Sequence, residues 1–192
     1  MNYLAHAYLS FSDYEIMAGN LAADFVKGRQ IDFFPENIQK GIRIHRLIDD
    51  YTDHHPVNLQ IKKIFEPSVG RYSASFLDVA YDHFLSIDTN LEPHEGWLAF
   101  SRDCYQKMDL VLPVFPDRFQ KLYSYMRTEN WLYSYREAQF IHQSFQRLSH
   151  RALYLADDNL AFSNFESGYS DIQAAFGAFF PELEGYVRNL GL

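Results

Sequence analysis

The scarcity of β-branched side chains limits most strongly what this chain can fold into. Val, Ile and Thr together account for 21 of the 192 residues. Strands favour these residues because branched side chains pack well on a pleated surface, so a large sheet is not expected. Hydrophobic residues make up 47% of the chain and aromatic residues 17%, which supplies a sizeable core. We therefore predict an all-α fold, a single-domain helical bundle covering residues 1–192.

Charge and cysteine content exclude several classes of protein. The net charge of −8 disfavours general binding to nucleic acid, whose backbone is also negative. Cys104 is the only cysteine, which excludes an intrachain disulfide and a cysteine-based zinc site. No run approaches the roughly 18 apolar residues of a membrane span, and the first ten residues lack the basic region of a signal peptide. We expect a cytoplasmic protein and leave its oligomeric state open.

Apolar spacing, prolines and glycines predict the helices. Pro56 suits the first position of a helix, and Gly28 suits the position just after one. We expect a break at 66–70, a loop at 112–117, and a kink or restart at Pro181. The predicted helices are 14–27, 36–54, 56–65, 71–87, 93–110, 117–127, 129–148 and 158–188.

A row of polar side chains marks the predicted helix 36–54. His45, Asp49 and Asp53 follow one another at intervals of four residues, so they share one helix face. An imidazole and two carboxylates offer nitrogen and oxygen ligands to Mn²⁺, Fe²⁺ or Zn²⁺. The alternative is a solvated helix face with an aspartate near the helix end.

Two further carboxylates interrupt an apolar stretch at 76–85. Asp78 and Asp82 are one helical turn apart, and a helix this apolar must be largely buried. Buried carboxylates are costly unless they are paired or bound to a metal. The alternative to a metal is a pair with a buried arginine, for instance Arg43 or Arg46.

Asp24 and His6 are the remaining candidates in the N-terminal half. Asp24 lies between small and apolar neighbours, on the side of its helix expected to face another helix. His6 interrupts an apolar opening stretch, where a satisfied core histidine is the alternative. Polar side chains thus interrupt apolar helices at four places within the first 83 residues, and this favours a ligand that they share. The aromatic run 131–140 is interpreted either as core or as the wall of a ligand site.

Several stretches of the chain resemble acyl carrier protein phosphodiesterases. The resemblance runs in order from residue 1 to about 140. It rests on MNYLAHAYLS, GNLAADFVKG, GIRIHRLIDDYTDHHP, LDVAYDHFLS, LPVFPDRF and YSYMRTENWLYSYR.

This resemblance implies a helical fold related to HD-domain phosphohydrolases. It also implies Mn²⁺ as the cofactor, for which we keep Mg²⁺ and Fe²⁺ as alternatives. The implied partner is holo-acyl carrier protein, whose 4′-phosphopantetheine arm is cleaved from a serine. The chain contains no His-Asp dipeptide, so the ligands of ordinary HD enzymes cannot be transferred to it. We infer the metal ligands to be Asp24, His45, Asp49 and Asp82. The residues expected around them are His6, Asp53 and Asp78.

The remaining roles follow from the chemistry of a phosphodiester. Asp24 is expected to be catalytic, and His83 or His6 to protonate the leaving serine. Arg46, or alternatively Arg43 or Lys27, is expected to stabilise developing charge. Basic residues near the metal would bind the substrate; these are Lys27, Arg43 and Lys62. Three alternatives stay open: an HD-like phosphohydrolase acting on a nucleotide or other small phosphoester, a metal-free helical binding module, and a helical iron redox protein. The last lacks the expected E-x-x-H pair in the N-terminal helices.

Overall fold

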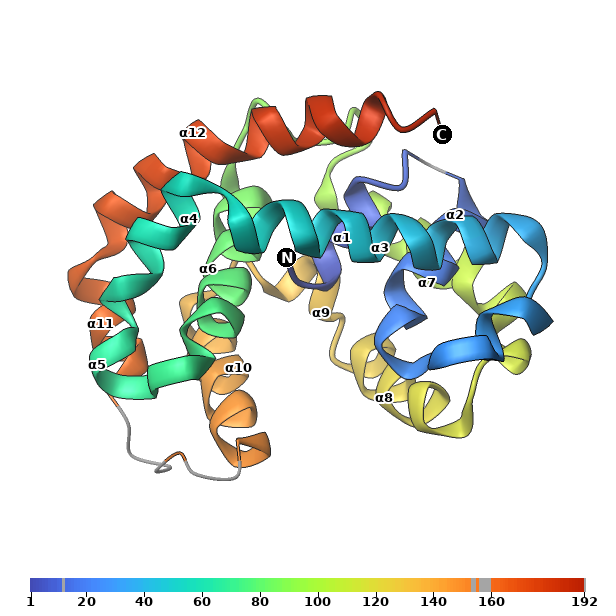
Figure 1. Cartoon of the computed structure of the whole chain (residues 1–192), viewed down its shortest axis with the longest axis horizontal. Coiled ribbons are helices and arrows are strands. Elements are labelled where there is room, and N and C mark those ends of the chain that lie inside the picture. The colour runs from blue at the N-terminus through green and yellow to red at the C-terminus, as the bar shows by residue number, and fades with distance from the viewer. Residues whose placement is uncertain (12, 153–154, 156–159, 192) are drawn as a thin grey trace.

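The computed structural model describes residues 1–11, 13–152, 155 and 160–191. These residues form helices, turns and irregular segments and no strand, which confirms the predicted all-α fold (Figure 1). The α-helices are α1 (Tyr3–Tyr8), α2 (Tyr14–Ala22), α3 (Glu36–His54), α4 (Pro56–Ile61), α5 (Glu66–Val69), α6 (Ser73–Ile87), α7 (Trp97–Val111), α8 (Asp117–Thr128), α9 (Trp131–Ser134), α10 (Ala138–Arg151), α11 (Ala161–Ser167) and α12 (Tyr169–Arg188). The 3-10 helices are η1 (Ala23–Phe25), η2 (Gly28–Phe33), η3 (Lys62–Ile64), η4 (Gly70–Tyr72) and η5 (Leu112–Val114).

Helix α3 crosses the middle of the molecule and joins two groups of helices (Figure 1). At one end α2, α7 and α8 pack together, and at the other end lie α4, α5, α6, α10 and α11. Helix α12 contacts both α3 and α4, while α1 and α9 lie near the centre. The core between these helices is strongly aromatic; Phe76, Phe119 and Phe179 are fully buried.

Helices α2 and α3 approach each other closely because glycine stands at both contact points. A Cβ atom at Gly19 would lie 2.1 Å from the carbonyl oxygen of Ile38, and one at Gly41 would lie 2.1 Å from that of Ile16. No side chain fits at such a distance, so only glycine allows this crossing. The seam fixes the C-terminal end of α2, and with it η1, beside the middle of α3.

Helix α1 was absent from the sequence prediction, and a distant residue explains why it forms. A helix of six residues is marginal by itself. Here the buried carboxylate of Asp82, on α6, accepts hydrogen bonds from the backbone N–H groups of Leu4 at 2.7 Å and Ala5 at 3.1 Å. These contacts satisfy N–H groups that the first turn of any helix leaves without partners. Asp82 therefore holds α1, and its His6, against α6.

Most other differences from the predicted helices are breaks at particular residues. The predicted helix 129–148 is divided into α9 and α10, and Asn130, with a left-handed φ of 49°, separates α9 from α8. The predicted helix 14–27 ends as an α-helix at Ala22 and continues as η1. The expected break at 66–70 contains the short helix α5 and ends at Gly70, whose φ is +53°. The predicted helix 93–110 begins later, at Trp97.

The predicted last helix, 158–188, is also two helices. Its first two positions lie outside the described residues, and α11 gives way to α12 at Gly168. A Cβ at Gly168 would lie 2.9 Å from Ile64, so this junction packs tightly against η3. Helix α12 continues through Pro181. The restart predicted at Pro181 is therefore wrong.

Candidate metal centre

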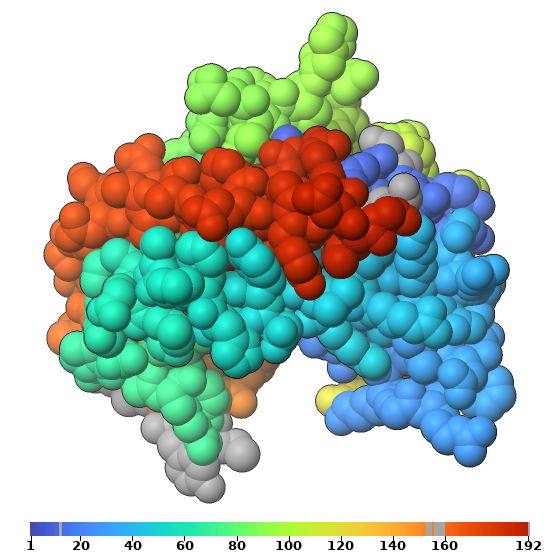
Figure 2. Space-filling model, turned by 45° about the horizontal axis from the view of Figure 1, so that its top comes forward, coloured from blue at the N-terminus to red at the C-terminus, as the bar shows by residue number. Residues whose placement is uncertain are grey.

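A cavity of about 420 Å³ lies beneath α3, where α1, α6, α9 and α10 converge. Figure 2 shows the molecular surface hollowed below α3, between the two groups of helices. Six side chains that can bind a metal line its wall, and four of them form one cluster. The four are His6 from α1, Asp24 from η1, and His45 and Asp49 from α3.

His6, His45 and Asp49 form the centre of this cluster. Their ligand atoms all lie within 4.8 Å of one another. The carboxylate of Asp49 bridges the two rings, with one oxygen 3.2 Å from His6 Nε2 and the other 3.0 Å from His45 Nε2. The rings themselves are stacked, with centroids 4.0 Å apart. Both histidines are buried, whereas Asp49 is partly exposed to the cavity.

Asp24 closes the cluster on its solvent side. Its Oδ1 lies 3.4 Å from His45 Nε2, and its side chain is 72% exposed. The sequence placed Asp24 on an apolar helix side, but α2 has already ended, and η1 turns this carboxylate outward. The close approach of α2 to α3, expected from the small residues, occurs one to two turns earlier, at Gly19.

The carboxylates give the two histidines opposite protonation states. Burial lowers the pKa of His6 to about 4, and the neighbouring His45 adds to this effect. Burial also acts to lower the pKa of His45, but Asp24 and Asp49 outweigh it and raise that pKa to about 9. Hydrogen bonding to His45 lowers the pKa of Asp24. At neutral pH the cluster therefore holds one neutral imidazole, one imidazolium and ionised carboxylates.

The α-amino group of Met1 lies beside the cluster and pairs with two carboxylates. It is 3.4 Å from Asp49 Oδ1 and 3.1 Å from Asp78 Oδ1. Burial opposes the charged form of Met1, but Asp78 and Asp49 raise the pKa of its amino group to about 10. Asp53, one helical turn beyond Asp49, also lines the cavity. The row His45, Asp49 and Asp53 predicted from sequence therefore does face one cavity.

The residues of this cluster fit a divalent cation. Nε2 of His45 faces carboxylate oxygens of Asp24 and Asp49, and Nε2 of His6 faces Asp49. Nδ1 of each ring has no hydrogen-bond partner among the described residues, so Nε2 is the nitrogen that each ring presents to the carboxylates. Two imidazoles and a carboxylate are a donor set that suits first-row transition metals. A cation held by His6, His45 and Asp49 would engage the nitrogens that face Asp49.

The structure brings Asp24, His45 and Asp49 together, but it uses Asp82 elsewhere. Both oxygens of Asp82 are bound to the backbone of α1, and Asp82 does not line the cavity. Burial raises the pKa of Asp82 to about 7. His6, expected around the ligands, takes the place that Asp82 was predicted to fill.

His83 also lies away from the cavity. Its Nδ1 is 2.8 Å from the carbonyl oxygen of Tyr135, and its Nε2 is 2.9 Å from the hydroxyl of Tyr169. These two contacts occupy both ring nitrogens of His83, and His83 does not line the cavity. The structure gives no contact through which His83 reaches a leaving group there.

The basic residues chosen from sequence are likewise peripheral. Arg46 is exposed and bonds to the carbonyl oxygen of Val26, and Arg43 bonds to Gln39. Neither arginine pairs with Asp78 or Asp82, as the alternative interpretation required. None of the basic residues predicted from sequence to bind substrate or stabilise charge lines the cavity that contains His6, His45 and Asp49. These residues are Lys27, Arg43, Arg46 and Lys62.

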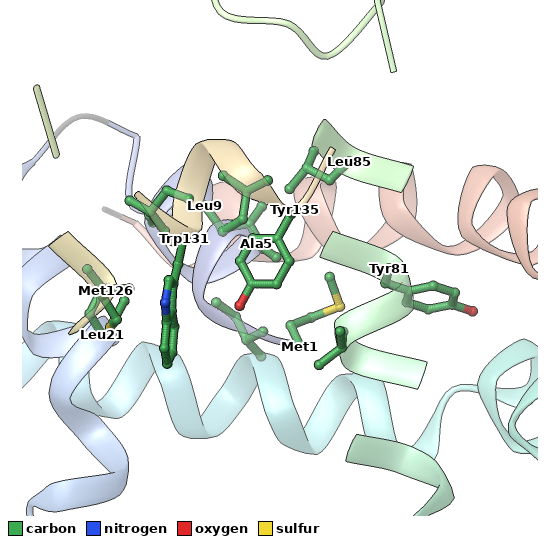
Figure 3. Close-up of a cluster of buried hydrophobic side chains, with 14 of the residues drawn as sticks. Met1, Ala5, Leu9, Leu21, Tyr81, Leu85, Met126, Trp131 and Tyr135 are labelled. Carbon is green, nitrogen blue, oxygen red and sulfur yellow. The ribbon is translucent and has the colours of Figure 1, made fainter. Parts of the chain in front are cut away.

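Sequence reasoning missed the basic side of the cavity. Arg147 and Arg151, one turn apart on α10, line it together with Trp131 and Tyr135. Figure 3 shows Trp131 and Tyr135 within the same buried cluster as Met1 and Ala5. The aromatic run is therefore both core and cavity wall. The spacing of the two arginines was a usable signal, because residues four apart share a helix face.

The fold and the cluster together define an all-α protein with a histidine–carboxylate centre suited to a divalent cation. A family model described as "Acyl carrier protein phosphodiesterase" matches residues 1–183. Relatives bearing that name include one from Enterobacter sp. (strain 638), 33% identical over 98% of this chain and 98% of the relative. One from Photorhabdus laumondii is 33% identical over 98% and 96%, and one from Salmonella paratyphi A is 32% identical over the full length of both. The chain belongs to the acyl carrier protein phosphodiesterase family.

Two further comparisons complete this description. No solved structure matches the chain. In the described part of the chain, no helix combines the length and the apolar character that crossing a membrane requires.

Proposed function

We propose that this protein hydrolyses the phosphodiester that joins 4′-phosphopantetheine to a serine of holo-acyl carrier protein. Membership of the family supports this substrate. The observation that carries the proposal is the stacked pair His6 and His45, bridged by Asp49 in a cavity that also contains two arginines. Cation ligands and anion-binding groups on one cavity wall are what cleavage of a phosphodiester requires.

We assign the cation to His6, His45 and Asp49, and we propose Mn²⁺. Two imidazole donors favour Mn²⁺ or Fe²⁺ over Mg²⁺, which prefers oxygen ligands. A divalent cation bound here would neutralise phosphate charge and lower the pKa of bound water. Asp24, ionised and open to solvent, is placed to accept a hydrogen bond from the attacking water and so orient it.

Arg147 and Arg151 provide the binding site for the phosphate oxygens. Guanidinium groups suit these oxygens because they donate paired, charge-assisted hydrogen bonds. Arg147 is held in place by a 2.6 Å hydrogen bond from its Nη2 to Glu129 and by stacking 5.0 Å from the centre of the Trp131 ring. In the reaction a bond forms between the water oxygen and phosphorus, the bond from phosphorus to the serine oxygen breaks, and a proton passes to that serine oxygen.

The proposal is tested by mass spectrometry of the carrier protein. Holo-carrier is incubated with this protein and Mn²⁺, and a parallel sample contains excess chelator. We expect the mass of the carrier to fall by that of the phosphopantetheine group only in the first sample. An unchanged carrier mass in the presence of folded protein and Mn²⁺ would refute the proposed activity. Cleavage undiminished by the chelator would refute the role of the cation.

A further inference from the structure

A second cavity, of about 710 Å³, adjoins the cavity that contains His6, His45 and Asp49, which we call the metal-site cavity. It lies between α8 and α10, and we call it the α8–α10 groove. Three residues line both cavities and therefore form the junction between them: Trp131, Arg147 and Arg151. A ligand bound to these residues is therefore next to both cavities.

One face of α8 forms the outer wall of this groove. Arg118, Lys121, Leu122 and Tyr125 recur at the spacing of a single helix face. The tyrosine ring is 62% exposed, so it presents a free aromatic surface. This wall combines apolar and aromatic contacts with positive charge, although the chain as a whole carries a net charge of −8.

Arg147 gives an independent indication of a ligand at the junction. Its Nη1 is buried and has no hydrogen-bond partner among the described residues. Its Nη2 is bound to Glu129, so the side chain is fixed in position. A buried donor of this kind normally has an acceptor, so this guanidinium keeps an unused donor beside both cavities.

We propose that the α8–α10 groove holds the pantetheine arm of the substrate, with its phosphate end at Arg147 and Arg151. This inference rests on the proposed function. The arm is a flexible chain of amide, hydroxyl and methyl groups bonded directly to the reacting phosphorus, so it must leave the metal-site cavity by a continuous path. The groove adjoins the metal-site cavity at the two arginines, and its volume falls within the usual range for small-molecule sites.

This placement agrees with cleavage on the serine side of the phosphate. When the arm occupies the groove, the phosphate remains with the arm and with the two arginines. The serine and its carrier protein then lie outside the groove. Tyr125 and Leu122 are positioned to contact the arm and not the reacting atoms.

Calorimetry with the Mn²⁺-loaded protein tests the groove directly. The probes are 4′-phosphopantetheine and inorganic phosphate. We expect 4′-phosphopantetheine to bind at least about tenfold more tightly, because only it occupies the groove. Tyr125→Ala should remove about fivefold or more of this advantage and leave phosphate affinity unchanged. Tyr14→Ala is the matched control, since its ring is also exposed but lines neither cavity, and it should alter neither affinity.

Four results would overturn the groove assignment. The first is equal affinity for the two probes, and the second is an equal loss for both probes in Tyr125→Ala. The third is a loss of affinity for apo-carrier in Tyr125→Ala that is as large as the loss for 4′-phosphopantetheine. This result would mean that the groove binds the protein surface of the carrier. Wild-type cleavage of holo-carrier with an unchanged KM in Tyr125→Ala would likewise reject the groove while leaving the proposed function intact.

Discussion

The imidazole rings of His6 and His45 stack with their centroids 4.0 Å apart and their planes 19° from parallel. One ring comes from the short helix α1 and the other from the middle of α3. Two imidazolium ions would repel each other at this distance. The pKa of His6, lowered to about 4, and that of His45, raised to about 9, show how the cluster avoids this. A metal, however, requires both rings to be neutral.

Binding of Mn²⁺ should therefore be coupled to loss of one proton from His45. Below pH 9 His45 is protonated in the metal-free protein, so a cation must displace that proton. The apparent affinity for Mn²⁺ should increase about tenfold for each pH unit between 7 and 9. Calorimetry at pH 7 and pH 8, in two buffers of different ionisation enthalpy, measures both the affinity and the proton release. A pH-independent affinity with no proton release would contradict this.

The same pKa predicts how the stability of the metal-free protein varies with pH. A histidine with a raised pKa stabilises the folded state fully below its unfolded pKa of about 6.5. This contribution is lost as the pH rises through the folded value of about 9. Urea unfolding between pH 6.5 and pH 9 should show falling stability in the wild type and a shallower decline in His45→Gln. Equal slopes in the two proteins would count against the assigned protonation.

The seam between α2 and α3 should not tolerate a methyl group. In Gly19→Ala the new Cβ would lie 2.1 Å from the carbonyl oxygen of Ile38, and the backbones would have to separate. We expect a loss of about 3 kcal/mol or more in the free energy of unfolding. Gly177→Ala on α12 is the control, because its Cβ meets nothing within 4 Å. It should stabilise the protein by about 0.5–1 kcal/mol. Similar unfolding curves for the two variants would contradict the close crossing.

Asp82 should act through structure and not through the cation. Asp82→Ala leaves the N–H groups of Leu4 and Ala5 buried without an acceptor, at a cost of about 1–3 kcal/mol each. Because α1 carries His6, affinity for Mn²⁺ should also fall. Asp50→Ala, at an exposed position of α3, should change stability by less than about 0.5 kcal/mol. Retained stability together with lost Mn²⁺ binding in Asp82→Ala would instead restore Asp82 as a direct ligand.

The sequence predicted the parts of the site that depend on local geometry. His45 and Asp49 were identified because residues four apart share a helix face, and α3 forms over the residues expected. The role of Asp82 was not predictable in this way, because its partners lie 77 and 78 positions away. Its burial was foreseen correctly, but burial alone does not distinguish a metal ligand from a helix cap.

The anion-binding side was missed for a different reason. Arg147 and Arg151 have the spacing of one helix face, but they lie beyond residue 140, where the resemblance ends. The helix that carries them was predicted to start at 129 and to stop at 148, so Arg151 fell outside it. Helix α10 in fact continues to Arg151, so both arginines belong to one helix.

The central claim is that Asp49, by bridging His6 and His45, holds the cation used for cleavage. Its most direct test compares Asp49→Asn with Asp50→Asn, adjacent substitutions of which only the first touches the cluster. Both variants are checked for folding by circular dichroism and then incubated with holo-carrier and Mn²⁺, and the carrier is weighed by mass spectrometry. We predict full conversion to apo-carrier by Asp50→Asn, and a rate at least about a hundredfold lower for Asp49→Asn. Equal conversion by the two folded variants would contradict the account.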